Sequence, residues 1–233
     1  MSTICLIGAS GRMGQTIQSL LPDTTSKICF SRLSKENIQE LVSSIKKSDY
    51  VIDFSHPANF ELALSACLLE KKPYMCCTTG LTSDHFELLK SASEKIPVIY
   101  ASNNSLGIVI LKKAVELVAK IFSEVEFGEN IDIAISETHH NLKKDAPSGT
   151  SLSLGNIINQ IIQNKSEINY SSIRGGNVVG EHTVHFFHND EVIKLSHECL
   201  NRNVFANGAI KAGNWLVKQQ PGFYSLDNVL GLK

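Results

Sequence analysis

Short apolar runs alternate with longer segments of helical apolar spacing through the first half of the chain. The runs with strand character cover residues 3–7, 27–30, 50–54, 73–77 and 97–101. The segments with helical spacing cover residues 13–21, 34–47, 57–69 and 82–93. Strands that alternate with helices in this way predict a doubly wound, parallel sheet with helices on both faces.

The second half has a different order of elements. We predict helices at 106–122, 149–162 and 204–218, and strands at 131–136, 181–187 and 192–198. The last two strands flank the turn His188-Asn189-Asp190 and should form a hairpin. Consecutive strands without helices between them are typical of an α+β domain with a mostly antiparallel sheet. We therefore expect an α/β domain over 1–104, an α+β domain over 105–215, and a tail, 216–233, that returns to the first domain.

Composition restricts the class of protein. The 233 residues include 22 lysines and arginines against 23 acidic residues, for a net charge of −1, and 42% are hydrophobic. This excludes an intrinsically disordered chain, and the balanced charge gives no reason to expect a nucleic-acid partner. No apolar run approaches the roughly 20 residues that cross a bilayer, so we expect no membrane association. The first eight residues lack the features of a targeting peptide.

The cysteines favour a reducing compartment. There are six of them, Cys5, Cys29, Cys67, Cys76, Cys77 and Cys199, and none forms a C-x-x-C pair. Most lie in apolar stretches, where a free cysteine behaves as a small hydrophobic residue. We expect a cytoplasmic protein without disulfides or a zinc site.

A glycine-rich turn follows the first predicted strand. Gly8, Gly11 and Gly14 have the spacing G-x-x-G-x-x-G and open the first helix. Glycine permits a tight turn and close approach to a pyrophosphate, which the N–H groups at a helix start would bind. The alternative is a glycine-rich turn without a ligand. We interpret the motif as the dinucleotide site of a Rossmann-like domain.

The end of the second strand bears on cofactor choice. Sites that prefer NADH place an acidic residue there for the ribose, but this chain has Ser31 and Arg32. A serine and an arginine suit a 2′-phosphate, and Arg12 could assist. We predict that NADPH binds at least as well as NADH. The alternative is that Arg32 is an ordinary surface charge.

The polar segment 137–150 contains the richest chemistry. His139, His140 and Lys143 lead into Pro-Ser-Gly-Thr at a predicted helix start, which suits a carboxylate. A histidine with a near-neutral pKa donates a proton, and Lys143 neutralises a second carboxylate. This pattern predicts the reduction of a small dianionic acid. Adjacent histidines on an extended strand point to opposite sides, so a metal held by both and Glu137 is disfavoured.

These motifs and others resemble one known family, 4-hydroxy-tetrahydrodipicolinate (dihydrodipicolinate) reductase. The matching segments keep their order and are Gly8–Gly14, Val51–Pro57, Thr78–Gly80, Ala101–Ser105, Glu137–Thr150, Arg174–Gly176, Gly180–Thr183 and Phe205–Ala209. The run H-H-x-x-K before D-A-P-S-G-T is the most specific. Cys77 stands where the family usually has a glycine before Thr-Thr.

The resemblance implies an NAD(P)H-dependent reductase of the diaminopimelate route to lysine. It also implies a homotetramer built through the sheet of the second domain. The residues implied for the pyrophosphate are Gly8, Ala9, Ser10, Gly11, Arg12 and Met13, and those for the nicotinamide side are Cys77, Thr78, Thr79, Ala101, Ser102, Asn103 and Asn104. The residues implied for the substrate are His139 as proton donor, Lys143 as second acid or carboxylate anchor, and His140, Gly149 and Thr150 as contacts.

Two other functions remain open from the residues alone. The first half would also fit a dehydrogenase for another small acid or imine. A non-catalytic dinucleotide sensor would bind the cofactor without turnover, but it leaves the histidine–lysine segment unexplained.

Overall fold

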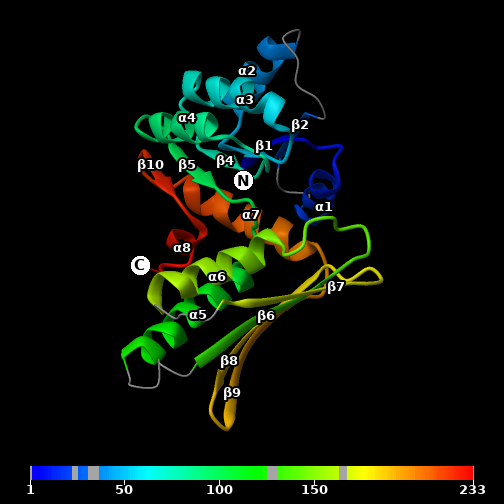
Figure 1. The fold of residues 1–233 in the computed structure, drawn as a ribbon. Helices are drawn as coiled ribbons and strands as arrows, with labels where there is room; N and C mark the ends of the chain where they lie inside the picture. Colours follow the sequence, from blue (N-terminus) through cyan, green and yellow to red (C-terminus); the bar gives the residue numbers. More distant parts are fainter. Residues whose placement is uncertain (1, 23–25, 31–36, 125–130, 163–166, 233) are drawn as a thin grey trace. The chain divides into compact units, whose positions relative to one another are not determined.

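The chain folds into two compact units. The computed structural model describes residues 2–22, 26–30, 37–124, 131–162 and 167–232. The first unit comprises Met1–Leu106 and Arg202–Lys233, and the second comprises Gly107–Asn201. Each unit has its own sheet (Figure 1).

A six-stranded parallel sheet forms the centre of the first unit. Its strands are β1 (Thr3–Ile7), β2 (Ser26–Phe30), β3 (Tyr50–Asp53), β4 (Tyr74–Cys76), β5 (Pro97–Tyr100) and β10 (Gly222–Tyr224). They lie in the order β10-β5-β4-β3-β1-β2, and every pair is parallel. Strand β2 lies on one side of β1, and β3, β4 and β5 follow in order on the other side of β1. The carboxyl ends of β1 and β3 therefore form the switch point where doubly wound sheets bind ligands, and the predicted fold class is confirmed.

Helices cover both faces of this sheet. They are α1 (Arg12–Leu20), α2 (Ile38–Lys47), α3 (Pro57–Leu69), α4 (Ser83–Ser93), α7 (Asn203–Leu216) and α8 (Leu226–Val229). Figure 1 shows α2, α3 and α4 on one face and α7 on the other. Local sequence explains where α3 begins, because Pro57 takes the first turn and the His56 ring accepts a hydrogen bond from the Ala58 N–H.

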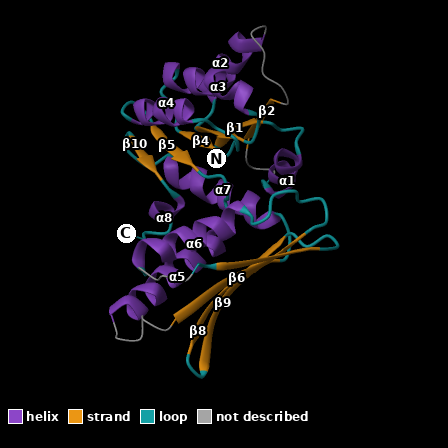
Figure 2. Ribbon diagram, viewed as in Figure 1, coloured by secondary structure: helices purple, strands orange, loops and turns teal. Residues whose placement is uncertain are grey.

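A four-stranded mixed sheet forms the second unit. Its elements are α5 (Leu106–Glu124), β6 (Ile131–His139), α6 (Gly149–Ile161), β7 (Asn169–Arg174), β8 (Gly180–His188) and β9 (Glu191–Cys199). The strand order is β7-β6-β8-β9, parallel between β6 and β7 and antiparallel elsewhere. Alternate residues of β6, from Ile131 to Ile135, are buried in a core with α5 and α6 (Figure 2). The hairpin of β8 and β9 was predicted.

Three features differ from the sequence-based expectation. Helix α7 was assigned to the second domain but belongs to the first unit, because it packs against α1 and strands β3 to β5. Strand β6 extends to His139, so the start of the expected loop is strand. Strand β7 was not predicted, since Asn169–Arg174 is largely polar and occupies a sheet edge. Among the described helices, none combines the length and apolar character of a membrane span.

Close packing of α7 on β3 depends on Gly213. A Cβ at this position would overlap the ring of the fully buried Tyr50. We expect Gly213→Ala to lower the free energy of unfolding by about 1–3 kcal/mol through overpacking. Urea denaturation measures the change. Gly175→Ala is the matched control, because a Cβ there would meet nothing within 4 Å; equal stability of the two variants would contradict the expectation.

Candidate active site

The glycine-rich turn lies at the carboxyl end of β1, where two glycines are required by close contacts. Gly8 has φ +83°, and a Cβ there would lie 2.5 Å from the Phe54 carbonyl oxygen. A Cβ on Gly14 would overlap the Gly8 carbonyl oxygen, so α1 can approach β1 only with glycine at this position. The turn is also held by Gly8 N–H and Ala9 N–H, which donate to the Phe30 carbonyl at 2.8 and 3.0 Å. These contacts bring the helix start to the switch point.

The other residues predicted for the cofactor follow β1, β4 and β5 at the same edge of the sheet. Ala9, Cys77, Thr78, Ala101 and Asn104 are buried, Met13 and Asn103 are half-buried, and Ser10, Gly11, Arg12, Thr79 and Ser102 are exposed. The Cys77 thiol donates to the Asn104 side-chain oxygen at 3.8 Å, and burial raises the pKa of this thiol. Arg32, predicted for the 2′-phosphate, lies outside the described residues.

A buried carboxylate connects the segments at this edge of the sheet by hydrogen bonds, and the sequence analysis did not single it out. Asp53, at the end of β3, accepts hydrogen bonds from the Tyr74 hydroxyl at 2.7 Å, the Ser55 N–H at 2.8 Å and the Thr78 hydroxyl at 3.3 Å. Burial raises its pKa, against the opposing effect of these hydrogen bonds. The Asp53 carbonyl also accepts from the Cys77 N–H at 2.9 Å. One residue therefore fixes the segments that follow β3 and β4.

In the second unit, a second buried carboxylate occupies the end of β6. The Glu137 side chain is 1% exposed. Four groups donate to its oxygens, and they are the Ser148 N–H at 3.1 Å, the Ser151 hydroxyl at 2.8 Å, the Ser172 hydroxyl at 2.8 Å and the Arg174 guanidinium at 2.6 Å. Burial acts to raise the pKa of Glu137, but the hydrogen bonds lower it to about 2. This carboxylate is therefore ionised throughout the neutral range.

Two histidines face the same carboxylate. The distance from Glu137 Oε2 is 3.6 Å to His139 Nδ1 and 3.8 Å to His182 Nε2, and the two imidazoles meet edge to face with centroids 5.0 Å apart. Burial lowers the pKa of His139, with Glu137 opposing the shift. Burial also lowers the pKa of His182, to about 4, so His182 is neutral at pH 7. His182 was not singled out from the sequence, because only the antiparallel pairing of β6 and β8 brings it opposite Glu137.

The remaining substrate candidates lie between β6 and the start of α6. His140 follows the end of β6 and is half-buried. Lys143 Nζ lies 2.8 Å from both carboxylate oxygens of Asp145, and this hydrogen bond lowers the pKa of Asp145. Gly149 and Thr150 occupy the first two positions of α6, after the N-cap Ser148, where backbone N–H groups point out of the helix. The structure thus brings His139, Lys143 and the α6 start into one region.

Glu137, His139 and His182 also have the spacing of a metal site, with potential ligand atoms within 4.8 Å of one another. The donors already present argue against a metal ion. Both oxygens of Glu137 accept hydrogen bonds, and the nearest donor is the Arg174 cation. A metal ion would displace these donors and face an arginine, so this carboxylate is suited to an ion pair.

Comparison with known proteins gives one consistent result. Residues 2–104 match the family model described as dihydrodipicolinate reductase, N-terminus, and residues 107–230 match its C-terminus. A 4-hydroxy-tetrahydrodipicolinate reductase of a Nitratiruptor species is 37% identical, with 100% of both chains covered. A protein of the same name from Rickettsia rickettsii (strain Sheila Smith) is also 37% identical, covering 98% of this chain and 99% of the relative.

A solved structure shares the fold. It is described as dipicolinate-bound dihydrodipicolinate reductase from Paenisporosarcina sp. TG-14. The TM-score is 0.76 at 21% identity, and the match covers 98% of this chain and 99% of the other. The arrangement of a parallel α/β unit followed by a mixed-sheet unit is therefore common to both.

The Glu137–Arg174 ion pair should contribute to stability in a pH-dependent way. The folded-state pKa of Glu137, about 2, is below its ordinary value of 4.5, so its contribution is present above pH 4.5 and is lost as the pH falls toward 2. We expect Arg174→Gln to lower the free energy of unfolding by about 2 kcal/mol at pH 7, and by less at pH 4. Urea denaturation at both pH values, with the exposed Lys144→Gln as control, measures this; a pH-independent difference would contradict it.

Proposed function

The chain belongs to the dihydrodipicolinate reductase family, and we propose that its reaction takes place at the His139–Lys143 region with a cofactor bound at the switch point of the first unit. It is an NAD(P)H-dependent oxidoreductase that reduces 4-hydroxy-tetrahydrodipicolinate to tetrahydrodipicolinate in lysine biosynthesis. The observation that carries the site assignment is the convergence of His139, Lys143 and the α6 start at one strand end.

The cofactor residues are assigned from the geometry of the first sheet. The start of α1 and the turn Gly8–Met13 present N–H groups to the pyrophosphate. Cys77, Thr78 and Thr79, with the segment Ala101–Asn104, follow the adjacent strands and line the nicotinamide side. When bound, the reduced nicotinamide supplies the hydride that the substrate receives at C4.

The substrate site is assigned to the second unit. The related structure with dipicolinate supports a small ring with two carboxylates as its ligand. Lys143 neutralises one carboxylate, and Gly149 and Thr150 at the N-terminus of α6 bind the other. His140 provides a further polar contact beside them.

The proton donor is assigned to His139 in preference to Lys143. Loss of the 4-hydroxyl group as water and hydride addition at C4 leave negative charge on the ring system, and one proton neutralises it. Lys143 is already held by Asp145, which suits an anchoring cation. His139 is buried, and a doubly anionic ligand beside it stabilises its protonated form.

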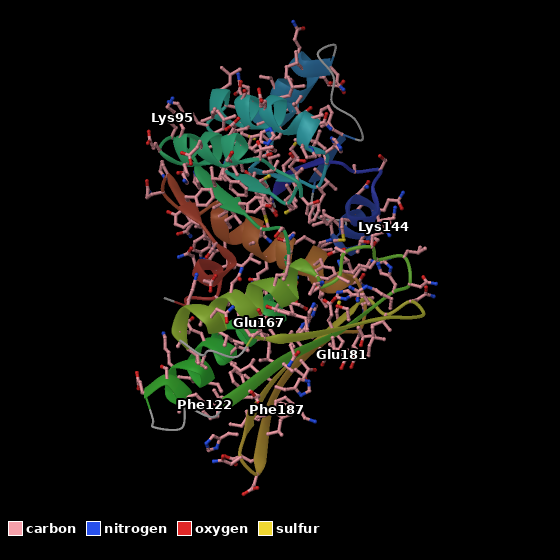
Figure 3. The ribbon with its side chains drawn as sticks, viewed as in Figure 1. Lys95, Phe122, Lys144, Glu167, Glu181 and Phe187 are labelled. Carbon is pink, nitrogen blue, oxygen red and sulfur yellow. The ribbon has the colours of Figure 1, made fainter. Side chains whose placement is uncertain are left out.

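The assembly is assigned as a homotetramer through the outer face of the second sheet. Three apolar side chains of this sheet are exposed, Ile173 (56%), Phe187 (39%) and Val192 (43%). The strand register places them on the face of the sheet that points away from the core with α5 and α6. Phe187 is labelled on these strands in Figure 3. An apolar face of this kind suits burial between identical copies. A cytoplasmic location is supported by the five described cysteines, which are buried and form no disulfide with one another.

Activity is tested by supplying the substrate from a synthase acting on pyruvate and aspartate semialdehyde and following loss of absorbance at about 340 nm, where reduced nicotinamides absorb. We expect His139→Gln to lower kcat by roughly 10²–10⁴-fold, because a positioned acid is lost, without changing the cofactor Kd. We expect Lys143→Ala to lower kcat and raise KM. The controls His85→Gln and Lys144→Ala should retain activity.

Two outcomes would contradict this assignment. Less than tenfold loss in both His139→Gln and Lys143→Ala would place the reaction elsewhere. Cofactor binding without turnover of this substrate or of any related acid by the unaltered protein would favour a dinucleotide sensor.

Cofactor preference is a separate prediction. We expect kcat/KM for NADPH to equal or exceed that for NADH, because Ser31 and Arg32 replace the usual acidic residue. Arg32→Gln should lower kcat/KM for NADPH about tenfold or more by removing a charged hydrogen bond, and leave that for NADH unchanged. The control is the exposed Lys46→Gln. A strong preference of the unaltered protein for NADH would overturn the prediction.

A further inference from the structure

The His139 ring has a carboxylate on one side and a glycine on the other. Its Nδ1 atom lies 3.6 Å from Glu137 Oε2, within the range of an ion pair, and makes no hydrogen bond within the described part of the chain. Gly180 leaves the other edge of the ring uncrowded, because a Cβ at this position would come within 3.1 Å of His139 Nε2. The His182 ring contacts the His139 ring edge to face. The Nδ1 edge of His139 therefore lies toward a buried carboxylate, and its Nε2 edge lies beside Gly180.

Glu137 cannot readily turn away from this position. Its four donors come from two different elements, the start of α6 and β7. One donor is the backbone N–H of Ser148, and another is the charged guanidinium of Arg174. Rotation of the carboxylate would leave these buried polar groups without a hydrogen-bond partner. The carboxylate is a fixed reference against which the imidazole is oriented.

We propose that Glu137 is a positioning residue for the proton donor: its buried carboxylate faces the Nδ1 edge of His139 at 3.6 Å, and its charge favours the imidazolium form and the ring orientation that leaves the Nε2 edge toward the substrate. The proposal rests on the proposed function, in which His139 is the donor. A carboxylate behind an imidazole fixes its tautomer and orientation and stabilises the imidazolium form. His182 supports the position of the His139 ring. Its Nε2 lies 3.2 Å from the Ser148 hydroxyl, and its ring packs edge to face against the ring of His139.

The charged and titratable groups around His139 define what the loss of Glu137 would do. Glu137 on β6 and Asp145 on the loop favour the imidazolium, whereas Lys143 on the same loop and Arg174 on β7 oppose it. On β8, His182 also faces His139. Replacement of Glu137 by glutamine leaves the two cations and removes the closest anion. The imidazolium then becomes less stable, so a step that needs protonated His139 fails at a lower pH.

The test is the pH dependence of kcat for the full-length enzyme and Glu137→Gln with saturating NADPH and substrate. We expect the alkaline limb of the profile to move to lower pH by about one unit, and kcat at pH 7 to fall about tenfold or more, with the NADPH Kd unchanged. The control is Glu124→Gln, an exposed residue at the end of α5, which should reproduce the unaltered profile.

A double-mutant cycle separates positioning from a purely structural role. If Glu137 acts through His139, Glu137→Gln lowers kcat in the unaltered enzyme but has less than a twofold effect in the His139→Gln background. Equal losses in both backgrounds, or an unshifted pH profile, would overturn the proposal. These results leave the proposed function intact, because it is tested separately by the activities of His139→Gln, Lys143→Ala and the unaltered protein. Should Glu137→Gln not fold, Glu137→Gln/Arg174→Gln, which removes both charges, carries the same test.

Discussion

The structure of the second unit depends on the hydrogen bonds and the ion pair that stabilise one buried carboxylate. An ionised carboxylate in the interior is tolerated only when it is paired and hydrogen-bonded. Glu137 meets this requirement with donors from the start of α6 and from β7. The same contacts that keep the anion buried therefore fix the helix start and the sheet edge beside the two histidines. Stability and site geometry have a common cause here, so a change at this carboxylate affects both.

The first unit uses the same arrangement with a different balance of charge. Asp53 is buried at the end of a central strand and joins neighbouring segments, but its donors are hydroxyl groups and one N–H rather than a cation. Burial therefore raises its pKa, whereas the pKa of Glu137 is lowered to about 2. The difference follows from the donors: the Arg174 cation and three further hydrogen bonds stabilise the charged form of Glu137, whereas Asp53 has no cation among its described donors.

The sequence predicted those features that depend on local pattern. Apolar periodicity located the parallel sheet and its helices, and the spacing of Gly8 and Gly14 located the switch-point turn. It could not place α7, because an amphipathic helix does not reveal which sheet it packs on, or β7, whose polar residues lack the strand pattern. The contacts of Glu137 with Arg174 and of Ser148 with His182 join residues 37 and 34 positions apart. Only the strand register and the packing of the α6 start bring these residues together, which is why His182 was missed.

The two cations near His139 differ in how easily each can leave its present carboxylate partner and bind a ligand. Arg174 is bound to a carboxylate that is 1% exposed, and breaking that pair would leave a buried charge uncompensated. Lys143 is bound to Asp145, whose side chain is 58% exposed and can return to water. Exposed pairs of this kind contribute about 0–1 kcal/mol, so in the site that we propose a substrate carboxylate replaces Asp145 on Lys143. The proposed exchange would release no buried charge and would add a second anion near His139, which would favour the protonated imidazole when the substrate is bound.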